Sequence, residues 1–137
     1  YGRFVEGIMA PSAYSTFTKM GFKIKKESHR EKDYENKKVY AELDTEFIAE
    51  YKGEKYIIIG EAKTYFTQKL LRKFFDKIRK LKAHEDYKDE KLVFFVAAVH
   101  YDKDIAEELQ KNGIYTFYVS DDVMELKVPK DFKPKEY

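Results

Sequence analysis

Eight consecutive apolar residues constrain the fold of this chain more than any other feature of its sequence. The run covers 92–99, LVFFVAAV, and is rich in valine and phenylalanine. It is far too short to span a membrane, which takes about 20 apolar residues. A strand that is apolar at every position suits a sheet with both faces covered. The run therefore predicts a buried strand with helices packed on both sides, and we expect no membrane partner.

Composition narrows the class of protein further. The 137 residues match the commonest size of one domain, so we expect a single domain over 1–137, with an irregular tail from about 121. Hydrophobic residues make up 43% and aromatic residues 17%, enough for a sizeable core despite 38% charged residues. The absence of cysteine excludes disulfides, cysteine-ligated metals and thiol nucleophiles, and favours a reducing, cytoplasmic location. The abundance of lysine and glutamate also points to a heat-adapted source.

Periodicity and turn residues give the order of the elements. A helix is expected over 4–20, started or kinked by Pro11 and ended by Gly21. Strands are expected at 22–26, 39–51 and 56–63, with an exposed loop at 28–38 after the first. A helix capped by Thr67, a strand at 92–99, a helix at 104–112 capped by Asp104 and a strand at 114–119 complete the series. The order α-β-β-β-α-β-α-β predicts an α/β fold, one mixed sheet flanked by helices.

The second and third expected strands form a hairpin that brings charged residues together. Side chains alternate along a strand, so Glu61 and Lys63 project from one face. A two-residue turn at 52–53 places Asp44 directly opposite Glu61, on that same face. A four-residue turn keeps the three side chains on one face, whereas a three-residue loop without a bulge separates them. The hairpin therefore predicts two carboxylates beside one ammonium group.

Two carboxylates on one sheet face suit a hard cation. Mg²⁺ prefers oxygen ligands, is often held by one or two carboxylates, and keeps several waters. Such an ion, or Mn²⁺ in its place, polarises a phosphodiester and lowers the pKa of a bound water. Lys63 is placed to orient that water or to balance charge in the transition state. The pattern predicts a metal-dependent hydrolytic site.

Asp44 followed after a hairpin by Glu61-Ala62-Lys63 resembles the PD-(D/E)XK nuclease superfamily, also called restriction-endonuclease-like. The element order is similar too, and the resemblance covers roughly 1–119, most of all to archaeal stand-alone members such as Holliday junction resolvases and uncharacterised nuclease-like domains. It implies that Asp44 and Glu61 hold the metal and that Lys63 assists the attacking water. Glu6 matches an acidic residue that many members place near the metal. The superfamily's proline-aspartate pair is Leu43-Asp44 here.

A strongly basic helix follows the hairpin. Seven basic residues against one acidic residue lie between 69 and 82, opposite an apolar stripe that faces the sheet. The candidate nucleic-acid-binding residues on this helix are Lys69, Arg72, Lys73, Lys77, Arg79 and Lys80. A row of cations beside an acidic centre offsets its repulsion of a phosphate backbone. The other interpretation of the row is a solvated face of a lysine-rich protein.

These patterns together predict a Mg²⁺- or Mn²⁺-dependent endonuclease that acts on DNA. Two alternatives remain at this stage: a catalytically inactive nuclease fold that binds nucleic acid, and a structural or interaction module with a solvated hairpin. The choice between DNA and RNA and the presence of a homodimer are left open by the sequence. Three unclustered histidines argue against a zinc site, and no glycine-rich phosphate loop is present.

Overall fold

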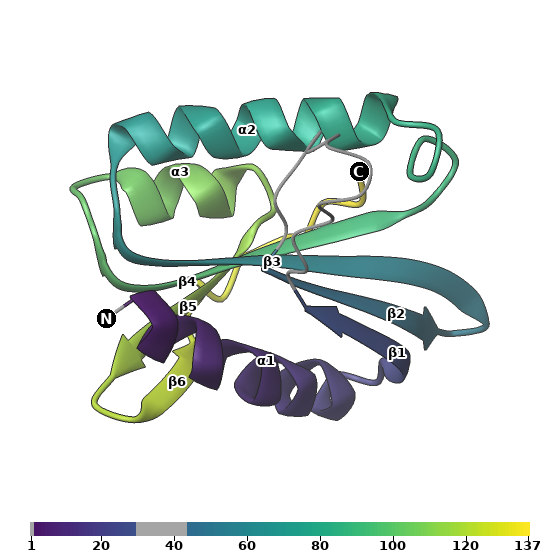
Figure 1. Cartoon of the computed structure of the whole chain (residues 1–137), viewed down its shortest axis with the longest axis horizontal. Coiled ribbons are helices and arrows are strands. Elements are labelled where there is room, and N and C mark those ends of the chain that lie inside the picture. The colour runs from purple at the N-terminus through teal and green to yellow at the C-terminus, as the bar shows by residue number, and fades with distance from the viewer. Residues whose placement is uncertain (1, 30–43) are drawn as a thin grey trace.

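The structure is a computed structural model that describes residues 2–29 and 44–137. Three helices and six strands follow in the order α1 (Gly2–Lys19), β1 (Lys23–His29), β2 (Thr45–Tyr51), β3 (Glu54–Phe66), α2 (Gln68–Ala83), β4 (Leu92–Tyr101), α3 (Ile105–Lys111), β5 (Tyr115–Ser120) and β6 (Val123–Leu126). The strands form one sheet in the order β1-β2-β3-β4-β5-β6. Its β3–β4 and β4–β5 pairs are parallel and the others are antiparallel, which makes the sheet mixed. Helix α1 covers one face, and α2 and α3 cover the other (Figure 1).

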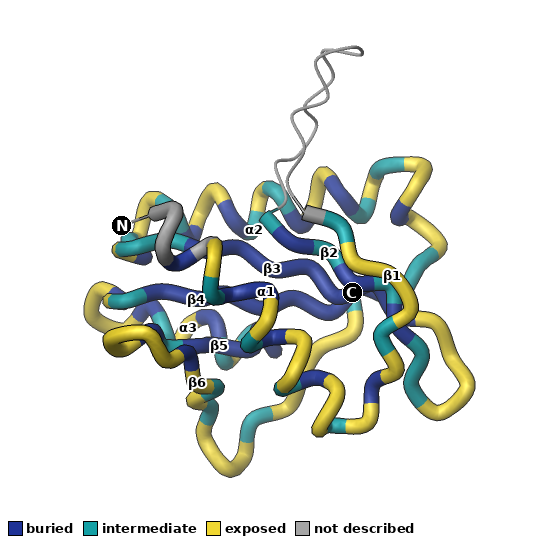
Figure 2. The backbone as a smooth tube through the Cα atoms, turned by 60° about the horizontal axis from the view of Figure 1, so that its bottom comes forward, coloured by how far each residue is buried: buried dark blue, intermediate teal, exposed yellow. Residues whose placement is uncertain are grey.

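The buried strand at the centre of the sheet is β4, as its apolar run predicts. Alternate β4 residues enter two separate cores. Val93, Phe95 and Ala97 pack on the side of α1, here called the α1 face. Leu92, Phe94, Val96 and Ala98 pack on the side of α2 and α3, the α2 face. Figure 2 shows β3, β4 and β5 buried along most of their length, so both faces of the central strands are covered.

The β2–β3 hairpin has the predicted register. Lys52 and Gly53 form a two-residue turn, and both adopt positive φ angles of 50° and 81°. Tyr51 therefore pairs with Glu54, and the ladder runs on to Thr45 opposite Gly60. Residues 39–43 of the expected strand lie outside the described residues.

The first helix and strand differ from expectation in their extent. Helix α1 runs through Pro11 and begins at Gly2, so the proline neither starts nor ends it. The helix is continuous here although Pro11 has no N–H to donate to the carbonyl of residue 7. Gly21, at φ 107°, ends the helix as predicted, with the Phe22 amide donating to the Phe17 carbonyl. Strand β1 continues to His29, where a loop was expected, because residues 28 and 29 pair with β2.

The C-terminal segment is more ordered than the sequence indicates. Residues 123–126 form β6, which pairs with β5 and is the edge strand of the sheet, so the expectation of an irregular tail from 121 is wrong there. The four residues VMEL do not alternate between apolar and polar, so they give no strand pattern. Further on, Tyr137 and Leu92 exchange two backbone hydrogen bonds of 2.8 and 2.9 Å, and the Lys135 amide donates to the Gly113 carbonyl. Asp104 occupies the N-cap of α3, but its side chain makes no capping hydrogen bond.

Replacing Gly113 with alanine is expected to lower the free energy of unfolding by about 1–3 kcal/mol. Gly113 has a φ of 72°, and an added Cβ would lie 2.3 Å from the Lys135 backbone nitrogen. Urea unfolding followed by circular dichroism measures the loss. The control is Gly7→Ala, since a Cβ at that exposed helix position meets nothing within 4 Å. It should stabilise the chain by about 0.5–1 kcal/mol, and equal effects of the two changes would contradict the docking of the tail.

Candidate active site

Glu61 projects from β3 toward α2 and is the most deeply buried acidic residue of the described chain. The preceding residue, Gly60, explains why the backbone of β3 has little freedom to move at this point. Gly60 faces the other side of the sheet, where an added Cβ would lie 2.0 Å from Cζ of Phe95. The Phe95 ring is itself fully buried. The backbone beside Glu61 is therefore clamped against the core of the α1 face.

Asp44 is held next to Glu61 by a hydrogen bond to the backbone of β3. It lies one residue before β2, just beyond the pair of Thr45 with Gly60 that ends the ladder. The Oδ2 atom of Asp44 accepts a hydrogen bond of 2.7 Å from the Ala62 amide. Because strand residues alternate, the next position after the Thr45–Gly60 pair turns to the α2 face, where Glu61 lies. The structure thus brings the two predicted carboxylates to the same end of the hairpin.

Two lysines contact the same oxygen of Glu61. The Nζ atom of Lys77, on α2, lies 2.7 Å from Glu61 Oε1, and the Nζ atom of Lys63 lies 3.8 Å from it. The Glu61 and Lys77 side chains are only 11% and 21% exposed. At this depth an ion pair interacts more strongly than at the surface, and removing one partner leaves the other charge poorly solvated.

Lys77 was expected on the outer, nucleic-acid-binding face of the helix, and the structure places it against Glu61 instead. Its position in the sequence contains a signal for this. It comes seven residues after Leu70 and three after Phe74, which puts it on the border of the apolar stripe. The sequence alone does not show which strand residue that border faces.

A small pocket of about 230 Å³ opens between β3 and α2 at this ion pair. It is lined by Glu61, Lys63, Phe66, Leu70, Lys73, Phe74 and Lys77. We call it the β3–α2 pocket. It contains two of the three residues predicted to carry the chemistry, together with two lysines of α2.

The remaining candidate nucleic-acid-binding residues of α2 divide into two groups. Lys69, Arg72, Lys73 and Lys80 are exposed, as a nucleic-acid-binding surface requires. Arg79 forms an ion pair with Asp76 one turn away on the same helix. Thr67 caps the helix as predicted, accepting a hydrogen bond from the Leu70 amide. Leu71, Phe74, Ile78 and Leu81 form its buried stripe.

Glu6 lies on α1, which packs against the opposite face of the sheet through Val5, Met9 and other buried residues. The side chain of Glu6 lies outside the described side chains, so its place near a metal stays a prediction. Within residues 2–29 and 44–137, no group of three or more histidine, aspartate or glutamate side chains could hold a metal ion. At the end of the β2–β3 hairpin, the described part of the chain offers the two carboxylates of Asp44 and Glu61.

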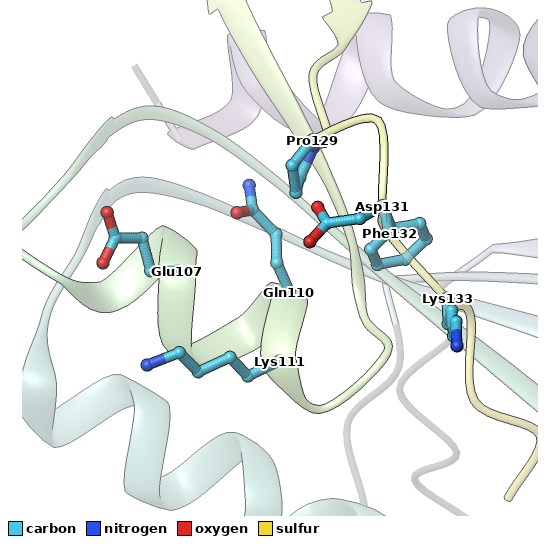
Figure 3. A pocket seen from close by; sticks show the side chains of 7 residues that line it. All are labelled: Glu107, Gln110, Lys111, Pro129, Asp131, Phe132 and Lys133. Atoms are coloured by element: carbon cyan, nitrogen blue, oxygen red, sulfur yellow. The ribbon is translucent and has the colours of Figure 1, made fainter.

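A second pocket, of about 510 Å³, lies between α3 and the C-terminal segment (Figure 3). Its lining carries both signs of charge, with Glu107 and Lys111 on the helix and Asp131 and Lys133 on the segment. Gln110 in its wall is held by a 2.9 Å hydrogen bond to the Thr116 hydroxyl. None of the predicted site residues lines this pocket.

In the described structure no helix is long and apolar enough to cross a membrane.

Comparison with known protein families identifies the family of this chain. A family model described as a domain of unknown function, DUF8196, matches residues 18–126. The chain belongs to the DUF8196 family. The match includes Asp44, Glu61, Lys63 and the whole of α2. No curated protein sequence matches the chain.

A comparison with solved structures finds a protein of the same fold. The DUF8196 chain is similar to a structure described as a repair endonuclease from Pyrococcus abyssi, with a TM-score of 0.54 and 19% sequence identity. The match covers 84% of this chain and 46% of that chain, so the DUF8196 chain spans about half the length of its structural neighbour. At this identity the likeness shows the fold alone. That fold is the expected mixed α/β, restriction-endonuclease-like arrangement, to which β6 is added.

Proposed function

We propose that this DUF8196 domain hydrolyses phosphodiester bonds in DNA with the help of Mg²⁺ or Mn²⁺. The observation that carries the proposal is the meeting of Asp44 and Glu61 at the end of the β2–β3 hairpin, with Lys63 in contact with Glu61. The nuclease-like fold supports it, and so does the description of the structural neighbour as a repair endonuclease.

The donor set at this place fits a hard divalent cation. Asp44 and Glu61 offer carboxylate oxygens, the ligands that Mg²⁺ prefers, and Mg²⁺ is often held by one or two carboxylates. When bound, the ion would supply a polarised phosphodiester and a water of lowered pKa. The Ala62 amide holds Asp44, and the clamped Gly60 holds the backbone of Glu61, so both ligands are positioned by β3.

Lys63 and Lys77 carry the positive charge of the site in distinct ways. Lys63 shares the face of Glu61 and is 38% exposed, so its ammonium group can reach a water or a phosphate oxygen in front of the carboxylates. Lys77, on α2, neutralises the charge of Glu61, so a metal cation that binds Glu61 competes with Lys77. The same ion pair favours a second candidate function, a nuclease fold that binds DNA without cleaving it, because the carboxylate is already neutralised internally.

A cleavage assay with the full chain separates the two functions. End-labelled single-stranded, duplex and four-way junction DNA, with single-stranded RNA for comparison, are incubated with Mg²⁺, Mn²⁺ or EDTA. The proposal expects cleavage of at least one DNA substrate with either metal and none in EDTA. Binding of DNA without cleavage under every metal condition would replace it with the second function. Cleavage that persists in EDTA would refute the metal-dependent mechanism.

Lys63→Ala is expected to slow cleavage by about 10²–10³-fold under single-turnover conditions while DNA binding is retained. The reason is that an ammonium group aimed at developing charge acts mainly in the transition state. Rates are measured by quenched-flow with excess enzyme. Lys55→Ala is the matched control, because Lys55 lies on the same strand but pairs with Glu90. If both variants cleaved at the parent rate, Lys63 would have no part in the chemistry.

Charge reversal on the outer face of α2 is expected to weaken DNA binding and to flatten its salt dependence. Arg72→Glu and Lys80→Glu should each lower the magnitude of the slope of log K against log salt by about 0.9 for a duplex, and the double variant by about 1.8. Fluorescence anisotropy at several salt concentrations measures the slope. Lys19→Glu, at an exposed position on α1, serves as the control. Equal slopes for all the variants would make the row of cations a solvated surface only.

A further inference from the structure

We propose that the β3–α2 pocket binds a terminal phosphate of a DNA strand, a phosphate monoester, and so places a strand end beside Asp44 and Glu61. This inference rests on the proposed function for the choice of DNA as the ligand. Beyond that function, it names the part of the DNA that the pocket recognises, which is a phosphate at the end of a strand.

The charge of the pocket matches a monoester better than a phosphodiester. Three lysines, Lys63, Lys73 and Lys77, face one glutamate in its lining, a formal net charge of +2. A phosphate monoester carries about −1.5 to −2 charges at pH 7. An internal phosphodiester of a DNA strand carries a single negative charge, so it leaves the pocket with excess positive charge.

The lysines are arranged around the pocket before any ligand arrives. Lys77 is held by its 2.7 Å contact with Glu61 and is 21% exposed, whereas Lys55, on β3, is 54% exposed. Among the described residues, Lys73 forms no ion pair, although it lies one helical turn before Lys77 in the same wall. One ammonium group is thus fixed and another is open to an incoming anion.

The volume of the pocket and the residues that close its core side favour a group at the end of a DNA strand. Its volume of about 230 Å³ lies below the range of about 300–1,000 Å³ that is usual for small-molecule sites. The buried rings of Phe66 and Phe74 close it on the core side. A phosphate group with several of its waters fits this space, and the closed core side leaves a strand no way to pass through it. A strand that enters phosphate first therefore stops there, with its first internucleotide bond near the two carboxylates.

Binding of short oligonucleotides in EDTA tests the inference without any cleavage. The probes are single-stranded DNA 12-mers of one sequence, labelled internally, that carry a 5′-phosphate, a 3′-phosphate or hydroxyl groups at both ends. Fluorescence anisotropy with the full chain is expected to give about tenfold tighter binding of one phosphorylated probe than of the hydroxyl probe. The two phosphorylated probes then show which end is recognised.

Substitutions of one lysine inside the pocket and of one lysine outside it make the test specific. Lys73→Met is expected to remove most of the preference for the phosphorylated probe. Lys69→Met, one turn earlier on the same helix and outside the pocket, should weaken both probes equally and keep their ratio. The charge-conserving Lys73→Arg should preserve the preference and shows that any loss comes from the charge. Equal affinities of the parent chain for all three probes, or an unchanged ratio in Lys73→Met, would overturn the inference.

The outcomes also separate this inference from the proposed function. A phosphate preference without any metal-dependent cleavage would support the pocket and reject the nuclease. Cleavage without a phosphate preference would reject the pocket and leave the nuclease standing.

Discussion

Asp44→Asn and Glu61→Gln are each expected to abolish Mg²⁺-dependent cleavage of DNA, with a loss of at least about a thousandfold in rate. A thousandfold loss corresponds to about 4 kcal/mol of transition-state stabilisation. Each substitution keeps the size of the side chain and removes the anionic oxygen that would hold the ion. Both variants are assayed in single turnover beside the parent chain.

The control for these variants is Glu46→Gln, which removes another carboxylate from β2 two residues after Asp44. Glu46 pairs with Ile59 rather than with the residues of the site, so the variant should cleave like the parent. Circular dichroism should show all three variants folded. Metal-dependent cleavage that survives in Glu61→Gln would refute the assignment of the site.

The largest expected loss of stability comes from truncating the ring that packs on Gly60. Phe95→Ala should lower the free energy of unfolding by about 3–5 kcal/mol, because it leaves a cavity in a core that cannot collapse fully. The Phe95 ring is completely buried, with ring centroids 5.5 Å from Phe17 and Phe117 and 6.4 Å from Phe47. Urea unfolding measures the loss.

A double-mutant cycle with Gly60→Ala shows whether this contact fixes the strand beside Glu61. Alone, Gly60→Ala should cost about 1–3 kcal/mol, since its new Cβ overlaps the Phe95 ring. In the Phe95→Ala background the added methyl group occupies emptied space, so its cost should fall by more than about 1 kcal/mol. Strictly additive costs would show that the two residues do not constrain each other.

The sequence predicts the features of this fold that arise from local periodicity. The two-residue turn at Lys52 and Gly53 fixes the register of the hairpin, and the register puts Asp44 and Glu61 on one face. The apolar stripe of α2 and the continuous apolar run of β4 are likewise visible in the sequence, because each has one way to bury its side chains.

Features that depend on contacts between distant elements could not be predicted in this way. The ion pair of Lys77 with Glu61 depends on how α2 lies over β3, which no local pattern encodes. Strand β6 exists because the edge of β5 offers backbone groups to pair with, and four residues give it no periodic signal. The docking of Tyr137 on Leu92 likewise joins residues far apart in the chain.

The central claim is that Asp44 and Glu61 together hold a divalent ion, and a crystal soaked with Mn²⁺ tests it most directly. Anomalous scattering locates the manganese without reference to any enzymatic activity. We expect a peak about 2.1 Å from an oxygen of each carboxylate, with Lys77 moved away from Glu61. A crystal saturated with Mn²⁺ that shows no peak between the two residues, with Lys77 still 2.7 Å from Glu61 Oε1, would contradict it.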